Sequence, residues 1–147
     1  MNNRSEVEII LNVYYLGDQE NEAMSRMQML ASMGIGLYHS GIEMNGIEYS
    51  YGGDPNNSGC GVFQGAPLSV ANATYKESYL LGTADSSTAY QVLGDVKQDF
   101  RANEYSLVGQ NCNHFSEAFA FKLLGKRCPS FINRLARAGT WVNFILP

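Results

Sequence analysis

The dipeptide Asn45-Gly46 constrains the fold more than any other feature of this sequence. Asn and Gly readily adopt the two positive φ angles of the tight turn that joins antiparallel strands. Both flanks are rich in Ile, Tyr and other residues that favour strands. We therefore predict a β-hairpin with strands over residues 35–40 and 47–51, which places His39 on its first strand.

Other segments show strand-like patterns. Residues 7–16, rich in Val, Ile and Tyr, are a predicted strand, as are residues 77–81. The Gly-, Pro- and Asn-rich segment 54–67 is expected to be a loop with a short strand at Val62-Phe63.

Helical spacing of apolar residues predicts four helices. The first covers residues 22–33, and the second begins at a Ser86 or Ser87 cap. The second helix buries Ala89, Leu93, Val96 and Phe100. The third runs from Cys112 to about Leu124, where Gly125 ends it, and the fourth starts after Pro129. Strands and helices together predict an α+β fold.

Composition limits the classes of function. The 147 residues are 45% hydrophobic and 16% charged, contain no repeat or linker, and are expected to form one domain over 1–147. A net charge of −4 argues against a nucleic-acid partner, because phosphate binding needs clustered Lys and Arg. The apolar run 7–16 is too short to span a membrane.

The cysteines favour a reducing compartment. Cys60, Cys112 and Cys128 are odd in number and far apart, which argues against a disulfide framework. We therefore expect a cytoplasmic protein, with the nucleus as a further location. Neither a CxxC nor an HxxxH spacing occurs, so no metal and no cofactor are expected.

Cys112 is the strongest candidate nucleophile. Asn111 is a good N-cap residue, which places Cys112 in the first turn of a helix. There the helix dipole and the unpaired N–H groups favour a thiolate, and the same N–H groups can hold an oxyanion. Cys60 and Cys128 lack both a helix start and a nearby histidine, so we interpret them as structural.

His39 is the better candidate for the base. His114 lies two residues after Cys112 and points to roughly the opposite side of the helix, which leaves His39. The spacing alone leaves open that both residues are structural, since buried cysteines are mostly inert.

Several segments resemble one family, in order and at matching spacing over residues 6–138. They are GLYHSGIE (36–43), EYSYGG (48–53), NEYSL (103–107), NCNHFS (111–116), LGK (124–126) and PSFINRL (129–135). This pattern is similar to that of the PPPDE family, the permuted papain-fold peptidases that include the DeSI deSUMOylating isopeptidases, and to its DeSI-2-like branch. The resemblance implies a circularly permuted papain-like fold, a small antiparallel sheet packed with helices, and a catalytic Cys at a helix N-terminus.

The resemblance also implies catalytic roles for His39 and Cys112 and a function. Members look like isopeptidases that remove ubiquitin- or SUMO-like modifiers from protein lysines. Two supporting roles are predicted beside the pair: Tyr51 orients His39, and Gln110, next to the Asn111 cap, donates to the oxyanion.

Two alternatives stay open. The same pair could hydrolyse S-acylated proteins as a thioesterase, with an apolar groove near Met24, Met27 and Phe63. The domain could also bind a ubiquitin-like protein without turnover. Trp141 is a candidate interface residue, and the oligomeric state stays open.

Overall fold

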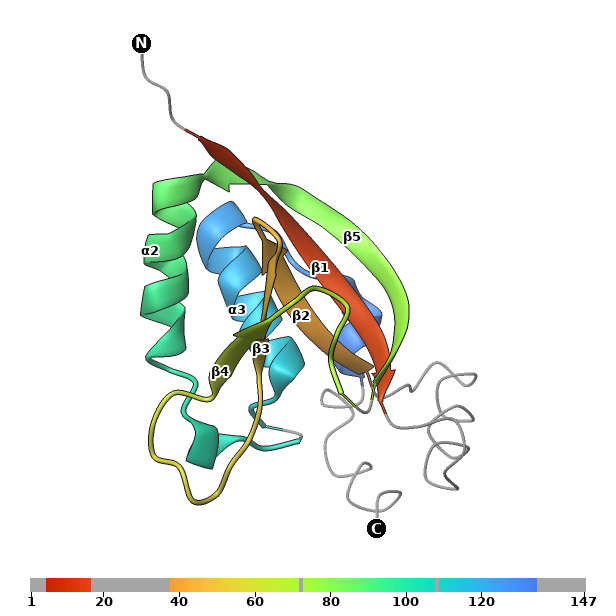
Figure 1. Cartoon of the computed structure of the whole chain (residues 1–147), viewed down its shortest axis with the longest axis vertical. Helices are drawn as coiled ribbons and strands as arrows, with labels where there is room; N and C mark the ends of the chain where they lie inside the picture. Colours follow the sequence, from red (N-terminus) through yellow and green to blue (C-terminus); the bar gives the residue numbers. More distant parts are fainter. Residues whose placement is uncertain (1–4, 17–37, 72, 108, 135–147) are drawn as a thin grey trace.

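The computed structural model describes residues 5–16, 38–71, 73–107 and 109–134. Within them, five antiparallel strands form one sheet in the order β4-β3-β2-β1-β5 (Figure 1). The strands are β1 (Glu6–Leu16), β2 (Tyr38–Met44), β3 (Ile47–Tyr51), β4 (Val62–Gly65) and β5 (Ala73–Asp85). The central strand β2 carries His39, with β1 on one side and β3 on the other.

The hairpin prediction is confirmed. Asn45 and Gly46 form the turn between β2 and β3 with φ angles of 51° and 75°. Strand β2 continues to Met44, beyond the predicted end at Ser40, because the two-residue turn lets both strands pair up to it. The predicted strands at 7–16, 62–63 and 77–81 are also present, and the last is part of the longer β5.

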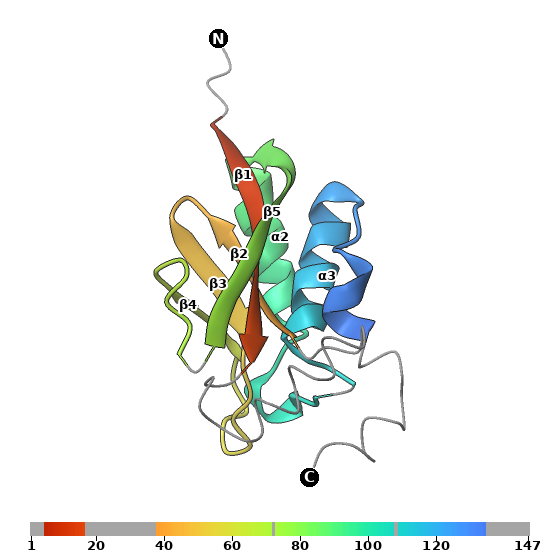
Figure 2. The ribbon, with the colours of Figure 1, turned by 90° about the vertical axis from the view of Figure 1, so that its right-hand side faces the viewer.

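Two α-helices lie in the described residues, α2 (Ser86–Lys97) and α3 (Cys112–Leu124), with 3-10 turns η1 (Ala102–Glu104) and η2 (Ser130–Asn133). Figure 2 shows both helices beside the sheet, with α3 and η2 next to each other. The chain is therefore α+β, as expected. Gly125 ends α3 with a φ of 66°, also as expected.

The predicted cap of α2 was wrong by one residue. Asp85, rather than Ser86 or Ser87, is the N-cap, and its carboxylate accepts a hydrogen bond from the Thr88 N–H at 3.1 Å. Asp is as good a cap as Ser, so neighbouring candidates are not separated by preference alone. Phe100 is buried as expected, but lies beyond the end of α2.

The two faces of the sheet differ in chemistry. The face toward the helices is apolar, and Ile9, Leu11, Val13, Ile42 and Phe115 from the strands and α3 are fully buried there. Because side chains alternate along a strand, the intervening residues lie on the other face. That face contains buried polar side chains: Asn12, His39, Glu48 and Ser50.

Some predictions fall outside the described residues: the helix over 22–33, the strand start at 35–37, the fourth helix beyond 134, and Trp141. None of the helices in the described ranges has the length and hydrophobicity needed to cross a bilayer.

Candidate active site

The first turn of α3 is fixed by its own side chains. The Asn111 Oδ1 accepts hydrogen bonds from the backbone N–H groups of Asn113 at 2.9 Å and His114 at 3.0 Å. In return, the Asn111 N–H donates to Nδ1 of His114 at 2.9 Å, which completes a capping box. Cys112 is therefore the first residue of the helix, as predicted.

Asn113 joins this helix start to β2. Its side-chain amide donates to the carbonyl oxygens of Tyr38 at 2.8 Å and Ile132 at 2.7 Å. Its Oδ1 accepts from the Ser40 hydroxyl at 2.6 Å. Strand β3 pairs with β2 from Ile42 to Met44. The start of α3 provides hydrogen bonds to the earlier part of β2, through Asn113.

The thiol of Cys112 lies against the backbone on both sides of His39. Its sulfur is 3.9 Å from the carbonyl oxygen of Tyr38, the residue before His39. The backbone N–H of Ser40, the residue after His39, also interacts with the thiol and lowers its pKa. Cys112 and Tyr38, which are 74 positions apart in sequence, thus meet at the start of one helix. Cys112 is 3% exposed and His39 is 7% exposed.

The imidazole of His39 contacts the polar face of the sheet. Its Nε2 lies 3.3 Å from Oγ of Ser50 on β3, and its ring centroid is 5.6 Å from that of Tyr14 on β1. The recorded hydrogen bonds of the two candidate residues thus run from His39 to Ser50 and from Cys112 to Tyr38, not to each other.

Burial keeps both groups neutral. It raises the pKa of the Cys112 thiol, although the Ser40 N–H, the Tyr105 hydroxyl and the Asn113 N–H act in the opposite direction. Burial also lowers the pKa of His39 from 6.5 to about 4. The N–H groups of the helix start lower the pKa of the thiol, as expected, but the cost of burying a charge outweighs their effect.

Comparisons with known proteins identify the family. A family model described as "PPPDE putative peptidase domain" matches residues 7–147. This chain belongs to the PPPDE family. The match covers all of the segments that carry the resemblance.

Three curated proteins are similar to this PPPDE chain. A desumoylating isopeptidase 1 homolog of Caenorhabditis elegans is 34% identical over 92% of this chain, and 39% of that protein is covered. A DeSI-like protein of Arabidopsis thaliana is 36% identical over 95% of this chain, with 59% of its length covered. A DeSI-like protein of Schizosaccharomyces pombe is 33% identical over 90% of this chain, with 66% covered. The chain thus spans less than two thirds of each.

Two supporting residues of the PPPDE chain have partners other than those predicted. The Tyr51 hydroxyl, expected to orient His39, donates to the carbonyl oxygen of Arg101 at 2.6 Å. The Gln110 side-chain amide, expected to face an oxyanion, donates to the carbonyl oxygen of Asp99 at 2.8 Å. Both side chains therefore stabilise the segment before α3.

Tyr105 was missed as a site residue. Its hydroxyl faces the Cys112 thiol, and the two groups interact electrostatically. Its ring is 5.0 Å from that of Tyr51 and packs against Gly53, where a Cβ would lie 2.7 Å from the Cβ of Tyr105. Tyr105 lies in the NEYSL segment of the resemblance, but nothing in its local pattern indicates contact with the thiol.

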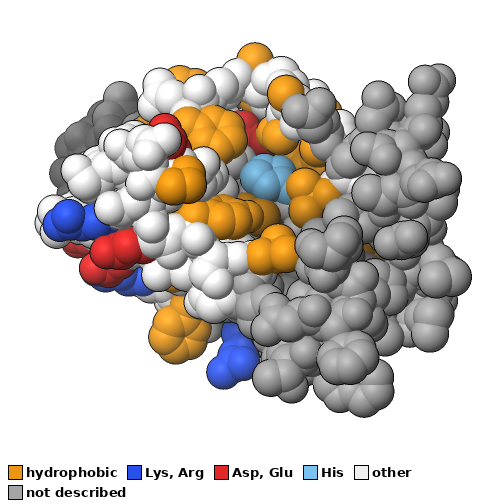
Figure 3. Space-filling model, turned by 90° about the horizontal axis from the view of Figure 1, so that it is seen from below, with side chains coloured by type: hydrophobic (Ala, Val, Ile, Leu, Met, Phe, Trp, Pro, Cys, Tyr) orange, Lys and Arg blue, Asp and Glu red, His pale blue; other side chains and the backbone are white. Residues whose placement is uncertain are grey.

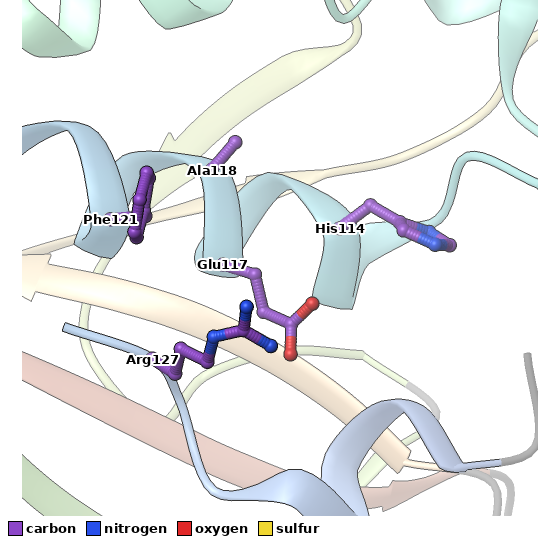
Figure 4. Close-up of a pocket in the computed structure, with 5 residues that line it drawn as sticks. All are labelled: His114, Glu117, Ala118, Phe121 and Arg127. Atoms are coloured by element: carbon purple, nitrogen blue, oxygen red, sulfur yellow. The ribbon is translucent and has the colours of Figure 1, made fainter. Parts of the chain in front are cut away.

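His114 faces away from the thiol, as the helical spacing predicted. With Glu117, Ala118 and Phe121 of α3, and with Arg127, it lines a pocket of about 360 Å³ (Figure 4). In Figure 4, Arg127 extends from the chain after α3 toward the helix side chains. Figure 3, which views the PPPDE domain from below, shows a histidine among hydrophobic side chains, with Lys and Arg side chains at the periphery.

The two cysteines outside the candidate site differ in exposure. Cys60 is exposed, Cys128 is buried, and neither forms a disulfide. In the described segments of this PPPDE chain, no cluster of three or more His, Cys, Asp or Glu side chains has the geometry to hold a metal ion.

Proposed function

We propose that this PPPDE domain is a cysteine isopeptidase with a permuted papain-like fold, in which Cys112 is the nucleophile and His39 is the base. The observation that carries the proposal is the position of the Cys112 thiol against the backbone of Tyr38 and Ser40, the two neighbours of His39. A cysteine at a helix start, beside a rigidly held histidine, fits nucleophilic catalysis of acyl transfer.

The reaction starts from a neutral pair. Nε2 of His39 is occupied by Ser50, so Nδ1 is the nitrogen that takes the thiol proton. The sulfur of Cys112 then attacks the carbonyl carbon of the isopeptide bond. The imidazolium returns its proton to the leaving lysine amine, and a thioester remains on Cys112. His39 next takes a proton from water, whose oxygen attacks the thioester carbonyl carbon and breaks its C–S bond. The imidazolium returns its proton to the Cys112 sulfur, and the modifier leaves as a carboxylic acid that loses its proton to the solvent.

Two donors hold the oxyanion in this proposal. The backbone N–H of Cys112 lies beside its own sulfur, while Asn111 caps the next two N–H groups of the helix. The Tyr105 hydroxyl faces the sulfur and is the second proposed donor. Donors that are oriented before the reaction stabilise developing charge.

The substrate reaches the thiol beside Tyr105 in this proposal. A pocket of about 260 Å³ is lined by Gly53, Asp54, Pro55, Ala102, Asn103 and Tyr105. Gly53 packs against Tyr105 at the rim of this pocket, since a Cβ at Gly53 would lie 2.7 Å from the Cβ of Tyr105. A modifier tail that ends in glycine suits entry here, because a glycine backbone can approach a buried thiol closely. The name of the Caenorhabditis elegans relative supports a SUMO-type modifier as the substrate, and a ubiquitin-type modifier is the other candidate of this proposal.

The test uses C-terminal coumarin amides of ubiquitin and SUMO under single-turnover conditions. We expect Cys112→Ala to abolish turnover and His39→Ala to slow it by a factor of about 10² to 10⁴. Cys60→Ser is the matched control, because Cys60 is exposed and contacts neither candidate residue. Turnover by Cys112→Ala at the wild-type rate would refute the proposal.

The same assays separate the two alternatives. An S-acyl thioesterase would hydrolyse a palmitoyl-cysteine peptide faster than either modifier amide, with the same dependence on Cys112. Of its predicted apolar groove, Phe63 is half exposed, and Met24 and Met27 lie outside the described residues. A binding module would retain affinity for the modifiers while the wild-type protein shows no turnover.

A further inference from the structure

Ser50 contacts His39 on the polar face of the sheet, the face that also contains Asn12 and Glu48. Its Oγ lies 3.3 Å from Nε2, and both side chains are buried, Ser50 at 1% exposure. Gly41 provides the space for this contact. A Cβ at Gly41 would lie 2.6 Å from Oγ of Ser50 and 2.8 Å from Oε2 of Glu48, too close for either side chain to remain in place. The Ser50 hydroxyl and the Glu48 carboxyl therefore share one confined space beside β2.

Glu48 is a buried carboxyl that receives hydrogen bonds from neutral donors. It is 3% exposed, and the Tyr14 hydroxyl lies 2.7 Å from both of its oxygens. The Asn12 amide donates at 2.5 Å and the Leu68 N–H at 3.4 Å. These contacts hold the Glu48 side chain in one position on the same face of the sheet as Ser50.

The Tyr14 phenol of β1 connects this carboxyl to the imidazole. Its ring centroid is 5.6 Å from that of His39, and its hydroxyl lies 2.7 Å from the Glu48 carboxyl. Burial and the hydrogen bond to Glu48 raise the pKa of Tyr14, which therefore stays a neutral donor. Hydrogen bonds and ring packing thus hold the side chains around Ser50 and His39 in place.

We propose that Ser50 is the positioning residue of His39: its hydroxyl accepts a hydrogen bond from Nε2–H, which leaves Nδ1 unprotonated for the thiol. This inference rests on the proposed function. It replaces the sequence-based expectation for Tyr51, which is the next residue along β3 and faces the other side of the sheet.

The first test is the tautomer of His39 in the wild-type protein at pH 7, measured from the ¹⁵N chemical shifts of its ring nitrogens. We expect a proton on Nε2 and none on Nδ1. Ser50→Ala should produce a mixture of both tautomers. A proton on Nδ1 in the wild-type protein would overturn the inference without the need for any variant.

The second test is kinetic, on the coumarin amides. Ser50→Ala should lower kcat roughly 10- to 100-fold with little change in KM, because it misplaces the base rather than the substrate. Ser50→Thr, which keeps a hydroxyl, should recover part of the rate. Ser87→Ala, at an exposed serine of α2, is the control.

The two proposals fail in different ways. If Cys112→Ala keeps its turnover, the proposed function is wrong. If Cys112→Ala is inactive while Ser50→Ala has the wild-type kcat and the wild-type His39 tautomer, Cys112 remains the proposed nucleophile and the positioning role of Ser50 is refuted.

Discussion

Asn113 connects the helix that carries Cys112 to the strand that carries His39. Its amide group donates to Tyr38 at 2.8 Å and its carbonyl accepts from Ser40 at 2.6 Å, so one side chain holds both neighbours of His39. The contact spans 75 positions of sequence. The relative position of the two candidate catalytic residues therefore depends on a buried asparagine that is itself neither nucleophile nor base.

We expect Asn113→Ala to destabilise the fold strongly. It removes the donor to the Tyr38 and Ile132 carbonyls and the acceptor of the Ser40 hydroxyl, which are all buried. Leaving such groups without partners costs about 2–4 kcal/mol in the free energy of unfolding. Urea unfolding at pH 7 measures this loss. Asn103→Ala, at an exposed asparagine, should stay within about 0.5 kcal/mol of the wild type, and an equal loss in both variants would contradict the role of Asn113.

Alkylation by iodoacetamide should follow exposure rather than helix position. Cys60 is exposed and should react first. Burial raises the pKa of Cys112 and raises that of Cys128 to about 12, so both should react slowly at pH 7.5. Mass spectrometry of digested samples gives the order. In the Cys60→Ser variant, labelling of the native protein should almost disappear. Fast labelling of Cys112 at neutral pH would show that its thiolate is populated without substrate.

Many local features could be predicted from the sequence because short-range chemistry determines them. The Asn45-Gly46 turn, the Asn111 cap and the end of α3 at Gly125 each depend on a few adjacent residues. The cap of α2 was misplaced by one residue because Asp85 and Ser86 are equivalent by preference.

Features that depend on packing could not be predicted in this way. Ser50, rather than Tyr51, contacts His39 because the alternation of β3 places residue 50 on the histidine side, and the predicted hairpin did not establish that register. The raised pKa of the Cys112 thiol depends on burial by residues from distant segments. The predicted pair of His39 and Cys112 came from the exclusion of His114 and from the family resemblance, since the sequence around either residue contains no signal of contact with the other.

The stability of the fold should fall in acid partly because of His39. Its pKa is lowered from 6.5 to about 4 in the folded chain, so between these values the unfolded chain binds more protons. The free energy of unfolding should therefore decrease as pH falls from about 6.5 to about 4, by about 3 kcal/mol, with no further loss from this group below pH 4.

Urea unfolding at pH 7, 5.5 and 4 tests this prediction against His39→Gln. Carboxylates titrate in both proteins, so the difference between the two curves isolates His39. The wild-type protein should lose more stability than the variant over this range. Parallel curves would show that the imidazole is solvated or already charged in the folded state.

Tyr105→Phe should separate the chemistry of the hydroxyl from the packing of the ring. The ring contacts with Tyr51 and Gly53 remain, whereas the O–H that faces the Cys112 thiol is removed. That hydroxyl lowers the pKa of the thiol, and the proposed mechanism also uses it as an oxyanion donor. We expect kcat/KM on the modifier amides to fall by a factor of about 10 to 100, with the free energy of unfolding changed by less than about 1 kcal/mol.

In Tyr105→Phe, the rate of Cys112 alkylation should begin to rise at a higher pH than in the wild type, because the thiolate loses a hydrogen-bond donor. Tyr90→Phe, on the exposed side of α2, is the matched control, and neither quantity should change in it. If Tyr105→Phe keeps the wild-type kcat/KM and the wild-type alkylation profile, the oxyanion is held by the Cys112 N–H and another donor. If kcat/KM falls while the alkylation profile is unchanged, the hydroxyl acts on the tetrahedral intermediate and not on the resting thiol.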